Sequence, residues 1–192
     1  QTITTYNERV FHERDLMNAV HSGREWFGEA FSTFTKSRTI TLPASDAVTG
    51  SDARLTVAVM GNSSTDCSFT VKQNEQLIGT IPVAGRGTYN YHPEGVLADR
   101  TFTLSQLNGN ANVQLTFNMP SDATAIGYLN YLELNYTRQL KLYNDQTTFR
   151  SLASINQPIS NYSITGAPAT AKVWDITNPL RPAQQQTTHR GS

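Results

Sequence analysis

The chain has 192 residues, of which 38% are hydrophobic, so it can bury a packed core and suits either one domain or a domain with an appendage. Lys and Arg total 15 and Asp and Glu also total 15, and this balance excludes the basic field on which nucleic-acid binding depends. No apolar run approaches the length that crosses a bilayer, so we expect no transmembrane segment.

The first residue is Gln1 rather than Met, which suggests a processed or recombinant fragment from which any signal sequence has been removed. Cys67 is the only cysteine, and this excludes an internal disulfide and a thiolate zinc cluster. Charged residues make up only 16% of the chain, which together with many Thr, Ser, Asn and Gln fits an exported β protein.

Residues 1–21 are mixed in character and predict an N-terminal extension with a short helical turn near 13–20. Beyond residue 37, apolar residues alternate with polar ones in short runs, as in half-buried strands. Turn residues at 74–75 and at 144–145 predict two hairpins, whereas 84–100 reads as a long irregular loop. The expected strands are 39–43, 54–60, 67–72, 76–83, 101–107, 112–118, 125–136, 138–143, 146–150, 159–164 and 171–176.

About ten short strands separated by turns predict an all-β fold, a jelly-roll-like β-sandwich. We expect the sandwich to span 22–177, after the extension at 1–21, and the Pro- and Gln-rich residues 178–192 to form a linker or tail. Three sets of alternating residues should face the core. They are Leu55, Val57 and Val59; Cys67, Phe69 and Val71; and Val113, Leu115 and Phe117.

No constellation of residues predicts catalysis. Cys67 shares its strand period with core positions, so we interpret it as a small buried residue and not as a nucleophile. The four histidines have no metal-ligand spacing, so no metal site is predicted from them. Asp46, Asp52 and Asp66 read as turn residues, and a structural Ca²⁺ held by such oxygens is the alternative.

Aromatic residues are the better functional candidates. Trp26 and Phe27 lie in SGREWFGEAF at 22–31, and Tyr89, Tyr91 and His92 lie in the loop YNYHPEG. Surface aromatics can stack on sugar rings, as in a carbohydrate-binding module. The other interpretation is that Trp26 and Phe27 plug the sandwich and that His92 packs on a neighbouring tyrosine.

Three segments in order carry a resemblance to a known family. They are SGREWFGEAF at 22–31, GYLNYLELNYTRQLK at 127–141 followed by QTTFR, and KVWDITNPLRP at 172–182. The chain resembles the N-terminal non-catalytic region of the PorU family, gingipain-like cysteine peptidases that act as sortases of the type IX secretion system in Bacteroidetes. It departs from the family pattern at Asn130, where an Asp is expected, and this weakens a ligand role for that position.

The resemblance implies an accessory domain of an exported protein at the cell surface and outer membrane. The family's catalytic His and Cys would follow residue 182, so no catalytic residue is carried over and the fragment is expected not to be an enzyme. Its partners would be its own downstream peptidase domain and either an outer-membrane β-barrel protein or secreted cargo.

In this context Trp26 and Phe27 would plug the sandwich or contact the peptidase domain, and Trp174 would do the same at the junction. Residues 175–179 would form a turn that fixes the angle between the domains. The alternative function is a carbohydrate-binding module of an exported protein, which requires Trp26, Tyr89 and Tyr91 to line an open groove.

Overall fold

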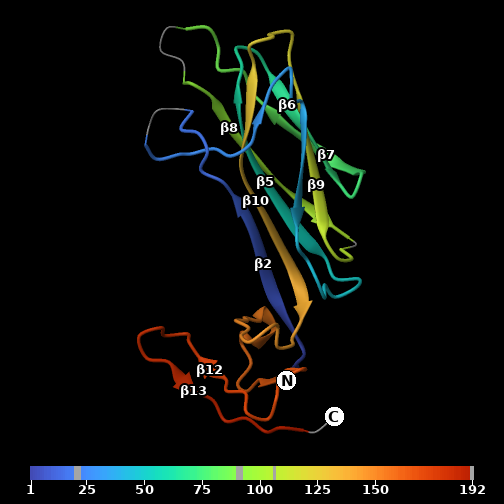
Figure 1. Cartoon of the computed structure of the whole chain (residues 1–192), viewed down its shortest axis with the longest axis vertical. Helices are drawn as coiled ribbons and strands as arrows, with labels where there is room; N and C mark the ends of the chain where they lie inside the picture. The colour runs from blue at the N-terminus through green and yellow to red at the C-terminus, as the bar shows by residue number, and fades with distance from the viewer. Residues whose placement is uncertain (20–22, 90–92, 106, 191–192) are drawn as a thin grey trace. The chain divides into compact units, whose positions relative to one another are not determined.

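The computed structural model describes residues 1–19, 23–89, 93–105 and 107–190 (Figure 1). Two of the candidate residues, Tyr91 and His92, lie outside the described residues. The chain packs as two compact units. The larger is Asn7–Arg138, and the smaller combines Gln1–Tyr6 with Gln139–Ser192. The units are therefore divided differently from the expected segments 1–21, 22–177 and 178–192.

The larger unit is a β-sandwich of two sheets, which confirms the predicted fold class. The first sheet has the order β2 (Thr5–Glu13), β10 (Ile126–Gln139), β5 (Ala53–Asn62), β8 (Val96–Leu104), and β3 (Ala30–Phe31) also pairs with β10. The second has the order β4 (Ser37–Leu42), β9 (Ala111–Asn118), β6 (Cys67–Gln73), β7 (Gln76–Val83). The expected hairpin at residues 67–83 is confirmed by the antiparallel β6–β7 pairing.

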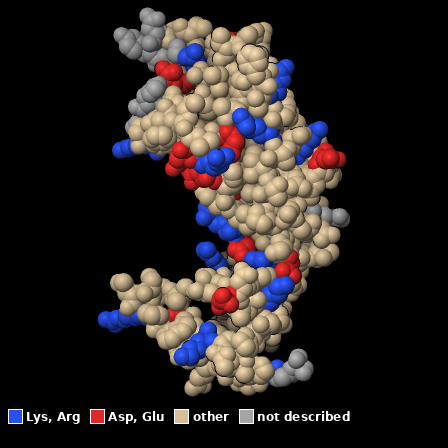
Figure 2. All heavy atoms as spheres, in the orientation of Figure 1, with Lys and Arg blue, Asp and Glu red and all other residues tan. Residues whose placement is uncertain are grey.

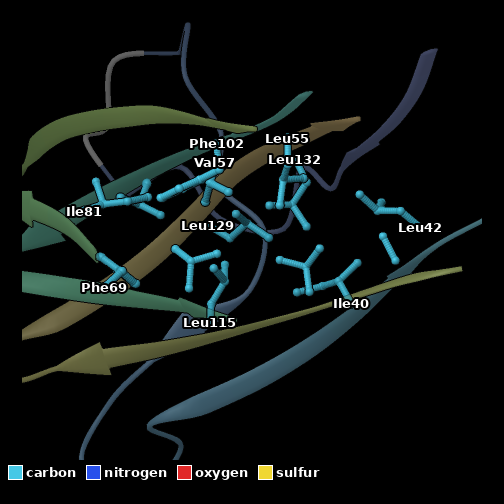
Figure 3. Close-up of a cluster of buried hydrophobic side chains, with 14 of the residues drawn as sticks. Ile40, Leu42, Leu55, Val57, Phe69, Ile81, Phe102, Leu115, Leu129 and Leu132 are labelled. Atoms are coloured by element: carbon cyan, nitrogen blue, oxygen red, sulfur yellow. The ribbon is translucent and has the colours of Figure 1, made fainter. Parts of the chain in front are cut away.

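The core lies between the two sheets because alternate side chains of each strand point to the same face. All three sets of residues predicted to face inward are buried, and each of these residues is at most 8% exposed. In Figure 3, Leu55, Val57, Phe102, Leu129 and Leu132 of the first sheet point toward Ile40, Leu42, Phe69, Ile81 and Leu115 of the second. Burial of this apolar surface is the main stabilising contribution to the sandwich.

The N-terminal segment differs from its prediction. Residues 5–13 form β2, and the expected helical turn near 13–20 is wrong for the described residues 13–19. Ion pairs fasten this edge strand to β10. Arg9 Nε lies 3.1 Å from Glu133 Oε1, and Arg138 Nη1 lies 2.9 Å from Glu8 Oε2. These partners are 124 and 130 residues apart in the chain, so local sequence patterns could not reveal them.

Two further strand predictions are corrected. The strand expected at 101–107 begins earlier, because β8 starts at Val96 inside the expected loop. Residues 146–150 form no strand, so the second predicted hairpin is wrong. There the Tyr143 N–H donates a hydrogen bond of 2.6 Å to Thr147 Oγ1, which closes a tight turn around Asn144 with its positive φ of 54°.

The smaller unit has short pairings and a small core. β1 (Thr2–Ile3) pairs with β11 (Asn161–Tyr162), and β12 (Trp174–Asp175) pairs with β13 (Ala183–Gln184). Ile3, Tyr6 and Leu140 are buried. Many apolar side chains stay at least 40% exposed, namely Leu152, Ile155, Ile159, Tyr162, Trp174, Ile176 and Leu180. In the described residues the only helix is a 3-10 turn, η1 (Leu152–Ser154), so none is long enough to span a membrane.

The pairing of β2 with β10 predicts a pH-dependent contribution to stability. The hydrogen bonds from Arg9 and then Asn135 lower the pKa of Glu133 below its ordinary value of 4.5. A carboxyl whose folded pKa is below its unfolded pKa stabilises the fold above the unfolded value and loses that contribution as pH falls through the folded value. Glu133→Gln should therefore reduce the free energy of unfolding at pH 7, with a deficit that shrinks steadily below about pH 4.

Urea unfolding at pH 7 and pH 3 would measure this effect. Glu75→Gln, at the exposed β6–β7 turn, is the matched control and should change stability little at either pH. An equal deficit for Glu133→Gln at both pH values would contradict the prediction.

Candidate functional site

The described part of the aromatic segment, residues 23–31, is held on both of its sides. The Phe27 N–H donates to the Met17 carbonyl at 2.8 Å, and the Met17 N–H donates to the Phe27 carbonyl at 3.0 Å. On the other side, the Gly28 N–H donates to the Leu129 carbonyl of β10 at 2.8 Å, and the Leu129 N–H donates to the Glu29 carbonyl at 2.9 Å. The segment thus lies fixed between residues 16–17 and β10.

A side chain at Gly28 would make a tight contact where the segment passes through this gap. A Cβ added at Gly28 would lie 3.2 Å from the Arg14 carbonyl oxygen and 3.6 Å from the Leu129 carbonyl oxygen. The missing side chain lets the backbone approach β10 closely enough for its hydrogen bond. The glycine after the two aromatic residues therefore serves close packing.

The two neighbouring aromatic residues have different environments. Phe27 is fully buried in a small cluster with Met60 and Tyr128, and its ring centroid is 5.9 Å from that of Tyr128. These residues form a cluster separate from the main core. Trp26 is 43% exposed. Phe27 is therefore buried, but in this separate cluster and not as a plug in the sandwich core, whereas Trp26 is partly exposed, because alternate residues of an extended segment face opposite sides.

Trp26 lines a hollow of about 390 Å³. Its walls come from β2 and the residues just after it, from the segment 24–26, and from β10. The lining residues are Phe11, Glu13, Asp15, Arg24, Glu25, Trp26, Asn130 and Tyr131. We call this site the Trp26 hollow.

Two features of β2 and β10 shape the Trp26 hollow. The rings of Phe11 and Tyr131 lie 5.3 Å apart between centroids and are tilted by 31°, so they form an aromatic pair. The register of β10 against β5 shifts between Leu129 and Tyr131, and Asn130 is the extra residue. Such bulges redirect side chains and are common beside binding sites. The position at which the sequence departs from the PorU pattern thus lies in the hollow.

The remaining candidates lie elsewhere. Tyr89 is 82% exposed and is not part of the hollow, and Trp174 belongs to the smaller unit, where it is 50% exposed. Sequence reasoning missed Phe11 and Tyr131. Phe11 lies in the segment read as an N-terminal extension, and Tyr131 lies in an apolar run whose alternation the bulge interrupts.

Cys67 is a core residue, as predicted. It is 8% exposed, and a Cβ added at Gly61 would lie 2.7 Å from its sulfur. Burial, followed by the charge of Asp66, raises the pKa of the Cys67 thiol to about 11. Because the thiolate is the nucleophile, this environment opposes nucleophilic chemistry at neutral pH.

We therefore expect Cys67 to react slowly with thiol reagents in the folded protein. A pKa of about 11 leaves about a hundredfold less thiolate at pH 8 than an ordinary thiol has, and burial restricts access further. The measurement is the rate of labelling by iodoacetamide at pH 8, with the urea-unfolded chain as control. Labelling of the folded chain at the unfolded rate would contradict the burial seen here.

Two acidic residues accept hydrogen bonds from backbone N–H groups, Asp175 within its own turn and Asp66 from a residue 19 positions along the chain. Asp66 Oδ1 accepts a hydrogen bond of 2.9 Å from the Gly85 N–H, and Asp175 Oδ1 accepts one of 2.9 Å from the Thr177 N–H. Among the described residues, no group of three His, Cys, Asp or Glu side chains is placed to hold a metal ion. A structural Ca²⁺ stays a prediction from sequence. The turn expected at 175–179 is present.

Surface charge is mixed in sign. On the face drawn in Figure 2, Lys and Arg side chains lie interspersed with Asp and Glu side chains, and most of the surface carries neither. This is the pattern expected of a chain whose formal net charge is zero. Any ligand preference must therefore come from a local group of side chains and not from a general field.

These observations define a class: an antiparallel β-sandwich with an aromatic-lined hollow, in a chain that also has a smaller unit with exposed apolar side chains. Among solved structures, the chain is similar to dimeric latent PorU from Porphyromonas gingivalis, with a TM-score of 0.78, 18% identity, and coverage of 100% of this chain and 18% of that chain. The resemblance to PorU is thus confirmed at the level of the fold. The chain spans less than a fifth of the PorU chain.

Weaker similarities involve carbohydrate-binding modules. The CBM36-1 domain of a xylanase from the hindgut metagenome of Trinervitermes trinervoides gives a TM-score of 0.37 at 13% identity, covering 67% of this chain and 95% of that one. CBM35 from Cellvibrio japonicus Abf62 gives 0.39 at 13% identity, covering 70% and 95%. No family model and no curated protein matches the chain.

Proposed function

We propose that this chain is a non-catalytic accessory β-sandwich domain of a PorU-type, cell-surface cysteine peptidase of the type IX secretion system. The observation that carries the proposal is the fold shared with PorU over the whole chain, which corresponds to only 18% of that protein. The catalytic residues of such a protein would lie in the rest of its chain. The buried thiol of Cys67, with its raised pKa, supports a non-catalytic role.

The smaller unit supports a positioning role. Seven apolar residues of this unit are at least 40% exposed, and their burial against a neighbouring domain would be favourable. Trp174, Ile176 and Leu180, each at least half exposed, are the proposed contacts to the downstream peptidase domain. An outer-membrane β-barrel protein or secreted cargo would be a further partner, in keeping with an exported location at the cell surface.

Carbohydrate binding is less well supported. It required Trp26, Tyr89 and Tyr91 to line one groove, and the Trp26 hollow does not include Tyr89. Tyr91 is outside the described residues. The CBM similarities all have low TM-scores and carry no argument for shared function.

Sequencing the source gene downstream of codon 182 tests the proposed function. A long open frame with a His and a Cys in gingipain-like order would support an accessory domain. A stop codon near position 192 would overturn it, because the chain would then have no peptidase domain to position.

A further inference from the structure

We propose that the Trp26 hollow binds an arginine side chain of a basic peptide. The proposal goes beyond the accessory role and does not depend on it, because it rests on the lining residues alone. The Trp26 hollow has a volume of about 390 Å³, which falls within the range of small-ligand sites and is sufficient for one side chain with adjoining peptide groups.

The first argument is the exposed aromatic surface. Trp26 is 43% exposed and Phe11 is 41% exposed, and both line the hollow together with Tyr131. The face of an aromatic ring attracts a cation, and tryptophan does so most strongly. Three rings around one hollow therefore favour a ligand that combines a flat or apolar body with positive charge.

The second argument is unbalanced charge. Glu13, Asp15 and Glu25 contribute three negative charges to the lining and Arg24 contributes one positive charge, so the net charge is 1 − 3 = −2. Within the described part of the chain, none of these three carboxylates makes an ion pair or a hydrogen bond through its side chain.

Other carboxylates of the same strands and segment are paired. Glu8 pairs with Arg138, Glu133 pairs with Arg9, and Glu29 Oε1 lies 3.5 Å from Arg14 Nη1. The contrast shows that charge is balanced around the hollow but not inside it. A cationic ligand would supply the missing charge, whereas a neutral sugar would gain no Coulombic attraction from it.

The third argument is that one ring of the hollow, Phe11, already holds a guanidinium. The Cζ of Arg9 lies 4.5 Å from the centroid of the Phe11 ring, and Arg9 Nε and Nη2 each lie 3.1 Å from a carboxylate oxygen of Glu133. A planar guanidinium can stack on a ring and bind a carboxylate with two parallel hydrogen bonds, which an ammonium cannot do. The hollow repeats these components with Trp26, Tyr131 and three carboxylates, so arginine is favoured over lysine.

The test is an NMR titration of the folded chain with acetyl-Gly-Arg-Gly-Arg-Gly-amide. We expect saturable shifts of the amides at 24–26 and 130–131, with a dissociation constant of about 1 mM. The citrulline peptide, which keeps the shape and loses the charge, should bind at least about tenfold more weakly. Raising the NaCl concentration from about 50 mM to about 500 mM should weaken binding of the arginine peptide.

Three variants separate the hollow from general electrostatics. Trp26→Ala and Asp15→Asn should each weaken binding of the arginine peptide about five- to tenfold. Glu75→Gln removes one carboxylate far from the lining and should leave binding unchanged. The fold of each variant is checked from its amide spectrum, and Asp15→Asn, which alters a single surface atom, provides the result if Trp26→Ala is perturbed.

Equal binding of the arginine and citrulline peptides would overturn the proposal, as would no shift with either peptide at about 10 mM. Shifts of the same amides with cellotriose and not with the arginine peptide would also overturn it and would assign the hollow to carbohydrate. None of these results bears on the gene organisation, so failure here is distinguishable from failure of the accessory-domain proposal.

Discussion

Replacing Phe69 with alanine is expected to lower the free energy of unfolding by about 3–5 kcal/mol. Phe69 is fully buried, and its ring lies 5.4 Å from that of Phe31 and 4.9 Å from that of Phe117. Gly127 of β10 packs directly against it, since a Cβ added there would lie 2.6 Å from Phe69 Cζ. The surrounding strands are paired and cannot collapse into the space, so the cavity adds to the lost transfer free energy.

Urea unfolding followed by circular dichroism measures this loss. Phe34→Ala is the matched control, because the same side chain is removed from a residue that is 97% exposed, and stability should change by no more than about 0.5 kcal/mol. A loss below about 1 kcal/mol for Phe69→Ala would mean that the three rings do not form the centre of the core.

The sandwich was predictable because its information is local. Residues 113, 115 and 117 alternate with polar residues, and this period alone determines which side faces the core once a strand forms. The turn at 74–75 likewise joins two runs that must pair if they form strands. Expected and observed strands therefore agree through most of β4 to β10.

The Trp26 hollow could not be predicted because it is made from three distant segments. Phe11, Trp26 and Tyr131 meet only after β2 pairs with β10. Partners in this pairing, such as Arg9 and Glu133, are 124 residues apart in the chain. A bulge at Asn130 also changes which side chains of β10 face outward, and no sequence period reveals it.

The resemblance contained more long-range information than the periodicity did. Two of its three segments are neighbours in the sheet, with Gly127 paired to Phe31 and Tyr128 paired to Ala30. The aromatic segment and the long apolar strand thus form one unit of packing. Their co-occurrence in a fixed order therefore has a physical reason. The resemblance indicated the fold correctly although this chain and the PorU chain share 18% identity.

Phe27→Ala is expected to remove the Trp26 hollow while leaving the sandwich folded. Phe27 is fully buried in a cluster apart from the main core, in which Met60 and Tyr128 are the other buried members among the described residues. Its loss should cost about 3–5 kcal/mol in the free energy that holds 16–17 against 27–28. Because stability is not uniform across a fold, this segment should open locally before the sheets separate.

Hydrogen exchange would detect the opening. The amides of Met17, Phe27 and Gly28, which donate to backbone carbonyls in the native fold, should exchange at least about a hundredfold faster in Phe27→Ala, while amides of β6 and β9 keep their protection. Trp26→Ala is the matched control from the adjacent position. It removes a larger side chain that is 43% exposed, so it should leave these amides protected.

Comparison of the two variants separates the anchoring residue from the contact residue. If Phe27 anchors the segment and Trp26 contacts a ligand, Phe27→Ala abolishes peptide binding by opening the wall, whereas Trp26→Ala weakens binding without opening it. Equal exchange rates in the two variants would contradict this division, because burial of Phe27 would then contribute no more to the segment than half-exposed Trp26 does. Gly28, which follows the two aromatic residues, keeps the backbone close to β10. The difference between the two rings follows from the side of the extended segment that each of them occupies.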